Sequence, residues 1–150
     1  MIAVLFPALG SWRVSRDADP IGRMLHHRHY SRRIYRDGRD PKKFVGPGEN
    51  LVLISWDDTA LFVWRKFRSM DHQAGVNCAL FRNEGSERSS CLILQAEDFA
   101  RARWPEERRF YTYINARRIR STNPGYCFLM AGWRRCGITK NGLVILEKTR

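Results

Sequence analysis

Residues 77–100 read NCALFRNEGSERSSCLILQAEDFA, and this stretch predicts a strand, a polar loop and a helix in immediate succession. The strand prediction, over residues 76–81, rests on a short apolar run without proline, which is typical of an interior strand. Ser89 or Ser90 is a suitable helix N-cap, and apolar residues then recur at helical spacing as far as Trp104, which precedes a proline.

The loop between this strand and helix has the composition of an anion site. It offers two cations and several backbone N–H groups at a helix start, where the helix dipole favours negative charge. The residues predicted to bind an anionic cofactor are Phe81, Arg82, Asn83, Gly85, Arg88, Ser89 and Ser90. The alternative is an ordinary connection in which the two arginines pair with Glu84 and Glu87.

Length and composition predict one compact domain. The chain has 150 residues, of which 43% are hydrophobic, enough for a single core. Its apolar runs are well short of the roughly 18 residues that a membrane helix needs, and residues 1–9 lack the features of a signal peptide. The four cysteines contain no C-x-x-C pair. We therefore expect a cytoplasmic protein without membrane contact, disulfide framework or zinc site.

The charge balance indicates an anionic partner. Lys and Arg number 27 against 15 Asp and Glu, which gives a net charge of +12 and a pI of about 10.3. Arginine exceeds lysine, and its planar guanidinium suits phosphate recognition. The arginines cluster in residues 32–39, 101–109 and 117–120, which favours nucleic acid over the alternative of a basic surface that only maintains solubility.

The rest of the chain alternates helices and strands, as in an α/β domain with a mixed sheet. Asp19 as N-cap and Pro20 at the first position predict a helix over residues 21–32. The other predicted elements are a hairpin of strands 51–56 and 60–66, a strand over 109–115, a helix over 125–135 closed by Gly137, and a strand over 142–147.

The order of these elements resembles the GNAT acyltransferase fold, a central mixed sheet flanked by helices. Residues 76–100 are similar to the segment in which those enzymes hold the pyrophosphate of acyl-coenzyme A. The sequence FRNEG followed by SS and a helix, and then YTYIN, NPGYCF, AGW and TKNGL, resembles the phage DNA-modification Mom family over roughly residues 20–148. This resemblance implies transfer of a carbamoylmethyl group to the exocyclic amine of adenine in duplex DNA, which protects phage DNA from restriction.

Acetyl-coenzyme A or a related acyl-coenzyme A is the cofactor that the resemblance implies, DNA is the partner, and a homodimer is compatible with it. The sequence departs from the GNAT pattern at two places. Arg88 and Ser89 stand where further small residues are usual in the phosphate loop, and Phe128 stands at the position of the usual general-acid tyrosine. Tyr126 is the nearest phenol.

Transfer to an amine needs a proton acceptor, a leaving-group donor and a group that orients the reactants. We predict His29 as the base, Tyr126 as the donor and Asn115 as the orienting group. Each has a structural alternative: a histidine packed on its helix, a tyrosine in the core and an asparagine that caps a turn. His26 and His29 share a helical face but lack further ligands, so no metal site is predicted.

The predicted substrate and DNA contacts are Tyr30, Ser31, Arg32, Arg33, Arg117, Arg118, Arg120 and Lys140. A base inside a duplex must be extruded before its amine can react, and Tyr30, Phe44, Trp56 and Tyr113 are candidates to stack on it. Two other functions remain open: an N-acetyltransferase that acts on a small-molecule, protein or modified-base amine, and a noncatalytic nucleic-acid-binding protein.

Overall fold

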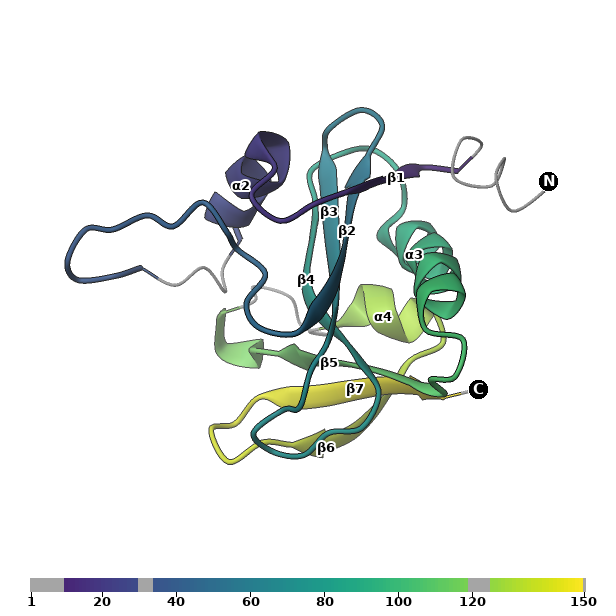
Figure 1. The fold of residues 1–150 in the computed structure, drawn as a ribbon. Helices are drawn as coiled ribbons and strands as arrows, with labels where there is room; N and C mark the ends of the chain where they lie inside the picture. The colour runs from purple at the N-terminus through teal and green to yellow at the C-terminus, as the bar shows by residue number, and fades with distance from the viewer. Residues whose placement is uncertain (1–9, 30–33, 119–124, 150) are drawn as a thin grey trace.

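The computed structural model describes residues 10–29, 34–118 and 125–149, and a seven-stranded mixed sheet forms its centre (Figure 1). Along the chain the elements are β1 (Trp12–Ser15), α2 (Pro20–His27), β2 (Glu49–Ser55), β3 (Ala60–Lys66), β4 (Val76–Asn83), α3 (Ser89–Arg103), β5 (Arg109–Ile114), the 3₁₀ helix η1 (Ala116–Arg118), α4 (Tyr126–Met130), β6 (Arg134–Ile138) and β7 (Val144–Thr149). The sheet order is β1-β2-β3-β4-β5-β7-β6, and only β4 and β5 are parallel neighbours in it. The predicted mixed α/β class is confirmed.

The central strands agree with the sequence. β4 lies between β3 and β5, so the prediction of an interior strand is confirmed. The predicted hairpin is also present: β2 and β3 are antiparallel and join through residues 56–59, where Asp58 adopts a φ of 62°. Asn and Asp tolerate this left-handed conformation better than most residues do, which suits a tight turn.

α2 begins as predicted but ends early. The Asp19 carboxylate accepts hydrogen bonds from the backbone N–H groups of Ile21 (2.8 Å) and Gly22 (3.4 Å), and Pro20 occupies the first turn. The helix ends at His27 rather than at residue 32. Asp19 and Pro20 thus predicted where the helix begins and gave no information on where it ends.

The strands β1 and β6 were not predicted from the sequence. β1 alternates apolar and polar residues (WRVS) but has only four residues, too few for a clear signal, and β6 is exposed along its whole length. The helix predicted over residues 125–135 is wrong beyond its first turns. α4 ends where Gly132 takes a φ of 92° and the Trp133 N–H bonds to the Phe128 carbonyl oxygen (3.0 Å), a Schellman ending. Gly137 lies within β6.

Helices cover both faces of the sheet (Figure 1). α3 and α4 pack on one face, where the larger core cluster includes Trp12, Trp64 and Trp133. The indole N–H groups of Trp12 and Trp64 donate to backbone carbonyl oxygens of α3, each at 2.9 Å. α2 covers the other face over a smaller cluster that includes Leu25 and Leu61. We call these the α3 face and the α2 face.

A buried carboxylate ties α3 to the last strands. The side chain of Glu97 is 1% exposed and receives Lys148 Nζ (2.8 Å), Arg101 Nη2 (3.1 Å) and Trp133 Nε1 (3.0 Å). All three donors therefore satisfy one charge that would otherwise be costly to bury.

Candidate active site

The strands β4 and β5 lie side by side for only three residue pairs, from Val76 opposite Phe110 to Cys78 opposite Thr112. The Thr112 hydroxyl donates to the Cys78 carbonyl oxygen (2.9 Å) at the last pair. Beyond it both strands continue unpaired with each other, and they separate in Figure 1. Ligands of α/β proteins commonly bind beyond the carboxyl ends of parallel strands. This gap is the candidate active site.

A β-bulge lies directly after the last of these pairs. Val63 of β3 lies opposite Leu80, whereas Trp64 lies opposite Cys78, so Ala79 is an extra residue in β4. A bulge leaves backbone groups of the extra residue out of the hydrogen-bonded ladder. The gap therefore opens beside backbone groups that the sheet does not use in its regular pattern.

The bulge also decides which side chains face the two helix layers. Beyond it, Phe81 packs on the α3 face, where its ring lies 6.1 Å from that of Phe128 in α4. Arg82 lies opposite Leu61 and so shares the α2 face. Its guanidinium reaches the end of α2 and donates to the Arg28 carbonyl oxygen (2.7 Å).

Glu84 holds the two arginines at this point. Its carboxylate binds Arg82 Nε (2.6 Å) and Arg28 Nη1 (2.7 Å), and the hydrogen bond from Arg82 lowers its pKa. The pairing of Arg82 with Glu84, predicted as the structural alternative, is thus confirmed. The pairing of Arg88 with Glu87 is not formed: in the described part of the chain Arg88 makes no ion pair, and Glu87 accepts from other groups.

The side chain of Asn83 organises the loop between β4 and α3. Its oxygen accepts from the Gly85 N–H (2.9 Å), and its nitrogen donates to the Glu87 carbonyl oxygen (2.7 Å) and to the Ser89 hydroxyl (3.0 Å). A Cβ on Gly85 would lie 2.3 Å from the Thr59 hydroxyl oxygen, so glycine lets the loop pack against the β2–β3 turn. The loop is held in shape without a ligand.

The N-cap of α3 is Arg88, so the prediction of a serine N-cap is wrong. Arg88 makes no side-chain cap hydrogen bond, and Ser89 and Ser90 are the first two residues of the helix. An exposed guanidinium thus stands at the start of a 15-residue helix whose first N–H groups lack a side-chain cap. This arrangement is suited to an anion.

His29 connects α2 to the gap. It hydrogen-bonds the backbone of Phe81, and burial lowers its pKa to about 4, with further contributions from the nearby positive charges of Arg82, His26 and Arg118. His29 is therefore neutral at neutral pH, in the form that accepts a proton. Two predicted regions, the histidine segment and the loop after β4, are brought together here.

The end of β5 supplies the third part of the site. The Asn115 side-chain oxygen accepts from the Arg117 N–H (3.2 Å), so the alternative that this asparagine caps a turn is confirmed. Arg117 Nη2 lies 4.0 Å from where a Cβ on Gly142 would be, which places the β6–β7 turn, with Lys140, beside η1. Arg117, Arg118 and Lys140 are exposed and form no ion pair with other described residues.

Tyr126 begins α4 close to the end of β5. A Cβ on the preceding Gly125 would lie 2.7 Å from Leu146 Cδ1 and 3.5 Å from Ile114 Cγ1, and Gly125 has a φ of 80°. Tyr126 itself is 54% exposed, so the alternative of a core tyrosine is wrong. Phe128, two residues later, is buried against the α3 face.

The stacking candidates do not gather at one point. Phe44 stacks on His26 with ring centroids 5.6 Å apart, Trp56 is 58% exposed, and the Tyr113 hydroxyl donates to Asp71 (2.7 Å). The remaining predicted contacts lie outside the described residues: Tyr30, Ser31, Arg32, Arg33 and Arg120. Sequence reasoning missed the bulge at Ala79, for which a short apolar run gives no signal.

The described residues contain no cluster of three or more His, Cys, Asp or Glu side chains that could hold a metal ion. In the same residues, no helix has both the length and the apolar character needed to cross a membrane. No protein-family model matches the chain, and no curated protein matches it either.

Proposed function

We propose that the chain is a GNAT-like transferase that modifies DNA by moving an acyl-derived or carbamoylmethyl group to the exocyclic amine of adenine. The observation that carries the proposal is the gap between β4 and β5, because residues from three separate segments meet there. These are His29 after α2, Arg82 at the end of β4 and Arg118 after β5. The sequence resemblance to the Mom family supplies the kind of group transferred.

The start of α3 fits the pyrophosphate of acetyl-coenzyme A or a related donor. Arg88 is not neutralised by a described carboxylate, and the N–H groups of Ser89 and Ser90 lack a side-chain cap. A thioester donor would supply an activated carbonyl carbon and a thiolate leaving group for acyl transfer, whereas transfer of a carbamoylmethyl group would need a donor that carries the CH₂ carbon and the amide nitrogen. Beyond Cys78 and Thr112 the backbone groups of β4 and β5 that face each other are not paired, so they could hydrogen-bond an extended chain, and backbone groups at the Ala79 bulge can orient a carbonyl oxygen.

His29 and Tyr126 would handle the protons. A bond forms between the amine nitrogen and the transferred carbon, the bond from that carbon to the leaving group breaks, and the amine proton passes to neutral His29. An anion bound beside Arg82 and Arg118 offsets their charge and moves the pKa of His29 upward, toward a more effective base. Tyr126, at the edge of the same gap, is the candidate donor to the leaving group.

The distribution of ion pairs limits where DNA would bind. Arg101, Arg103 and Arg109, from one predicted cluster, pair with Glu97, Glu49 and Glu147. By contrast, Arg117, Arg118 and Lys140 face solvent without such partners among the described residues. Duplex DNA would therefore contact the end of β5, next to the gap, and extrusion of the base would cost about a few kcal/mol.

Mass spectrometry of nucleosides from cells that express the protein tests this proposal. We expect a modified deoxyadenosine with the wild-type chain and with Arg103→Ala, a control that removes an ion-paired arginine remote in sequence from the gap. We expect its loss with His29→Ala and a strong decrease with Arg88→Ala. Unmodified DNA from soluble, folded protein would contradict the proposal.

A binding experiment then separates the two other functions. An N-acetyltransferase with another acceptor would bind acetyl-coenzyme A in an Arg88-dependent manner, and added DNA would not change that binding. A noncatalytic DNA-binding protein would bind duplex DNA and not the thioester. For the DNA contacts, Arg117→Ala with Arg118→Ala and Lys140→Ala should lower the slope of log affinity against log salt by about 2 to 3.

A further inference from the structure

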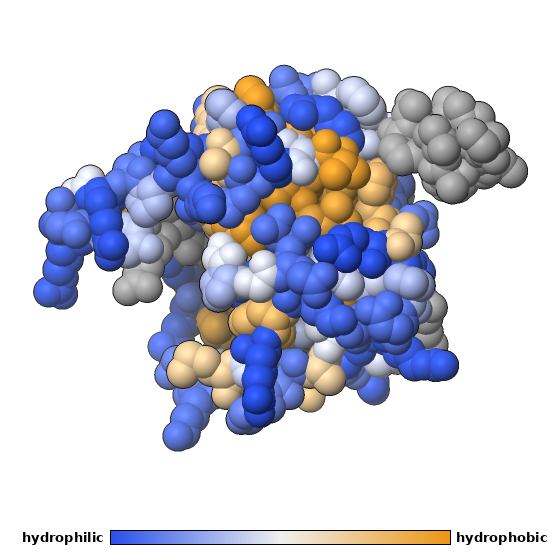
Figure 2. Space-filling model, viewed as in Figure 1, coloured by the Kyte–Doolittle hydropathy of each residue, from blue (hydrophilic) through white to orange (hydrophobic). Residues whose placement is uncertain are grey.

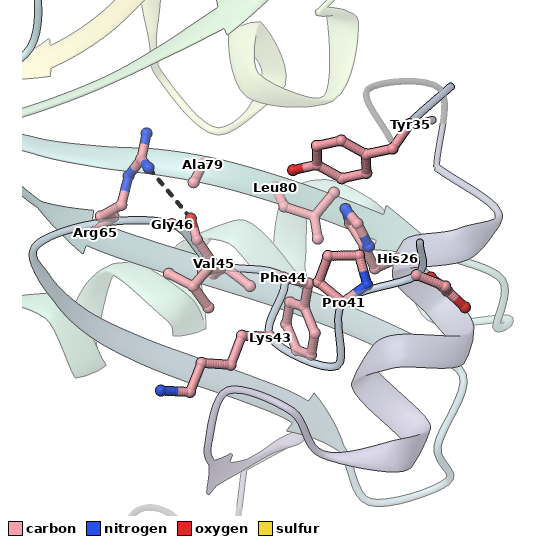
Figure 3. A pocket seen from close by; sticks show the side chains of 12 residues that line it. His26, Tyr35, Pro41, Lys43, Phe44, Val45, Gly46, Arg65, Ala79 and Leu80 are labelled. Carbon is pink, nitrogen blue, oxygen red and sulfur yellow. Dashed lines mark hydrogen bonds between the residues drawn. The ribbon is translucent and has the colours of Figure 1, made fainter. Parts of the chain in front are cut away.

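A pocket of about 440 Å³ lies on the α2 face, next to the candidate active site but lined mostly by other residues (Figure 3). Ala79 and Leu80, which the bulge places side by side on this face, contribute to its apolar floor. The loop of residues 41–46 forms one wall, and His26 and Tyr35 form another. In Figure 3 the Tyr35 hydroxyl and the Arg65 guanidinium lie at opposite sides of this space.

Arg65 and Lys43 are the two cations that line the pocket, and Arg65, the more buried of them, has no anionic partner among the described residues. Its Nη1 donates to the Val45 carbonyl oxygen (3.2 Å), and its guanidinium lies 3.7 Å from the ring centroid of Phe67. Its Nε is buried without a hydrogen-bond partner in the described structure. The one carboxylate that lines the pocket, Asp40, is bound instead by Arg23 at 2.8 Å. A half-buried cation without a counter-ion costs stability, which favours a ligand that supplies one.

The backbone fixes the position of this guanidinium. Gly46 has a φ of 95°, which disfavours any residue with a side chain, and a Cβ there would lie 2.3 Å from Arg65 Nη1. The glycine therefore allows the guanidinium to sit against the wall of the pocket. The cation is held in place before any ligand arrives, which reduces the entropy cost of binding.

Two more buried polar groups without partners lie beside Arg65. Asn77 is opposite Arg65 across β3 and β4, and Tyr111 is opposite Asn77 across β4 and β5, so the three residues form a row on the α2 face. Asn77 is 3% exposed and Tyr111 is 0% exposed, yet the Asn77 oxygen and the Tyr111 hydroxyl have no hydrogen bond in the described structure. Buried polar atoms are normally paired, but neither Asn77 nor Tyr111 lines the pocket and the unpaired Asn77 atom is an acceptor, so within this row Arg65 alone points to an anion.

We propose that this pocket binds a small organic anion, whose carboxylate or phosphate pairs with Arg65 and whose apolar or aromatic body rests on Ala79 and Leu80. The bidentate geometry of a guanidinium matches either acid group. Because the floor of the pocket is apolar, we expect an acid with a hydrophobic body to bind better than a free inorganic ion. The proposal is independent of the transferase reaction, because it rests on residues outside that mechanism, apart from the shared bulge.

NMR of arginine Nε–H groups tests it directly, with the Arg65 signal identified by its absence in Arg65→Lys. The probes are benzoate and phenyl phosphate. Benzamide is the control that has the aromatic ring without the charge, and inorganic phosphate is the control that has the charge without an aromatic ring. We expect saturable shifts of the Arg65 signal with one or both aromatic anions, at a Kd on the order of 1 mM, which is usual for molecules of this size. The stronger of the two identifies the acid group. Arg68→Gln, which removes an exposed arginine nearby in sequence, should leave binding unchanged.

Two results would overturn the proposal: no saturable shift with either aromatic anion, or equal shifts with inorganic phosphate. A variant that keeps Arg65 guards against misfolding as the explanation. Gly46→Ala should weaken probe binding at least tenfold, because the new methyl group displaces the guanidinium. Unchanged binding in that folded variant would also contradict the proposed site.

Discussion

The two faces of the central strands treat buried polar groups differently. On the α3 face, Glu97 binds three donors, and the indoles of Trp12 and Trp64 both reach backbone carbonyl oxygens, while the Trp104 indole N–H is the exception without a partner in the described structure. On the α2 face, Arg65 and Asn77 carry buried polar atoms without partners in the described structure. The same two strands, β3 and β4, contribute to both faces.

This difference suggests that the α3 face mainly stabilises the fold, whereas the α2 face carries the groups that could bind a ligand. Paired polar groups and a large aromatic cluster make the α3 face the main source of stability. Unpaired groups lower stability and are usually retained where a ligand completes them. The α2 face also carries His29 and the Arg82–Glu84 pair, so the proposed base lies on the side with the smaller core.

The largest effect is expected on the α3 face. Glu97→Ala leaves Lys148 and Arg101 without their buried acceptor and should lower the free energy of unfolding by about 3–5 kcal/mol. Denaturant titration measures this change. Asp98→Ala removes an exposed partner of Arg101 and should cost under about 1 kcal/mol. Equal losses in the two variants would remove the distinction between buried and exposed pairing.

The protonation of His29 should make the α2 face sensitive to acid. The folded pKa of about 4 lies below the ordinary value of 6.5, so its contribution is present above pH 6.5 and is lost as the pH falls toward 4. With allowance for partial exposure, wild-type protein should lose about 1–3 kcal/mol more than His29→Gln over that range. An NMR titration that gives an ordinary pKa for His29 would contradict this prediction.

Asn83→Ala should have a moderate effect, confined to the loop before α3. It removes three hydrogen bonds and should cost about 1–2 kcal/mol, because the exposed bonds are partly replaced by water. Hydrogen exchange should quicken at residues 84–89 and stay unchanged in β3. The control is Asn141→Ala, in the exposed turn between β6 and β7. Faster exchange throughout the sheet would mean that the loop is part of the main cooperative unit.

The smallest change in stability is expected for Arg65→Met. The substitution keeps an apolar stem over Phe67 and removes a cation without an ionic partner in the described residues, so the free energy of unfolding should change by less than about 0.5 kcal/mol or rise. Thermal unfolding at fixed pH compares it with Glu97→Ala. A loss as large as that of Glu97→Ala would show that Arg65 has a structural role, and the contrast between the two faces would fail.

The sequence predicted the elements whose patterns are local. The interior strand β4 follows from an apolar run, the hairpin from its Asp-rich turn, and the start of α2 from Asp19 and Pro20. β6 could not be predicted in this way, because it is exposed throughout and is a strand only through its antiparallel pairing with β7. The early end of α4 depends on which of two glycines takes a positive φ, and that is decided by tertiary packing.

The candidate site was predicted as separate pieces. Arg82 and Asn83 could be proposed from a loop pattern, and His29 from its chemistry, but their proximity depends on contacts between residues more than 50 positions apart, such as Arg82 with Arg28. The unpaired state of Arg65 had no sequence signal, because a carboxylate elsewhere in the chain could have neutralised it. Such an absence becomes visible only when the neighbours are known.

The bulge at Ala79 changes which face of the sheet the later side chains of β4 point to. Side chains alternate between faces, so one additional residue reverses the assignment of everything beyond it. If Ala79 instead paired regularly with Val63, every later residue would shift by one position, so Arg82 would point toward α3 and Phe81 toward α2, and the arginine could not approach His29. Deletion of Ala79 would remove the bulge and leave residues 80–83 on their present faces, because Leu80 would then follow Cys78 in a regular ladder. The contact between Arg82 and His29 therefore depends on the bulge, which absorbs one residue, as much as on the identity of either side chain.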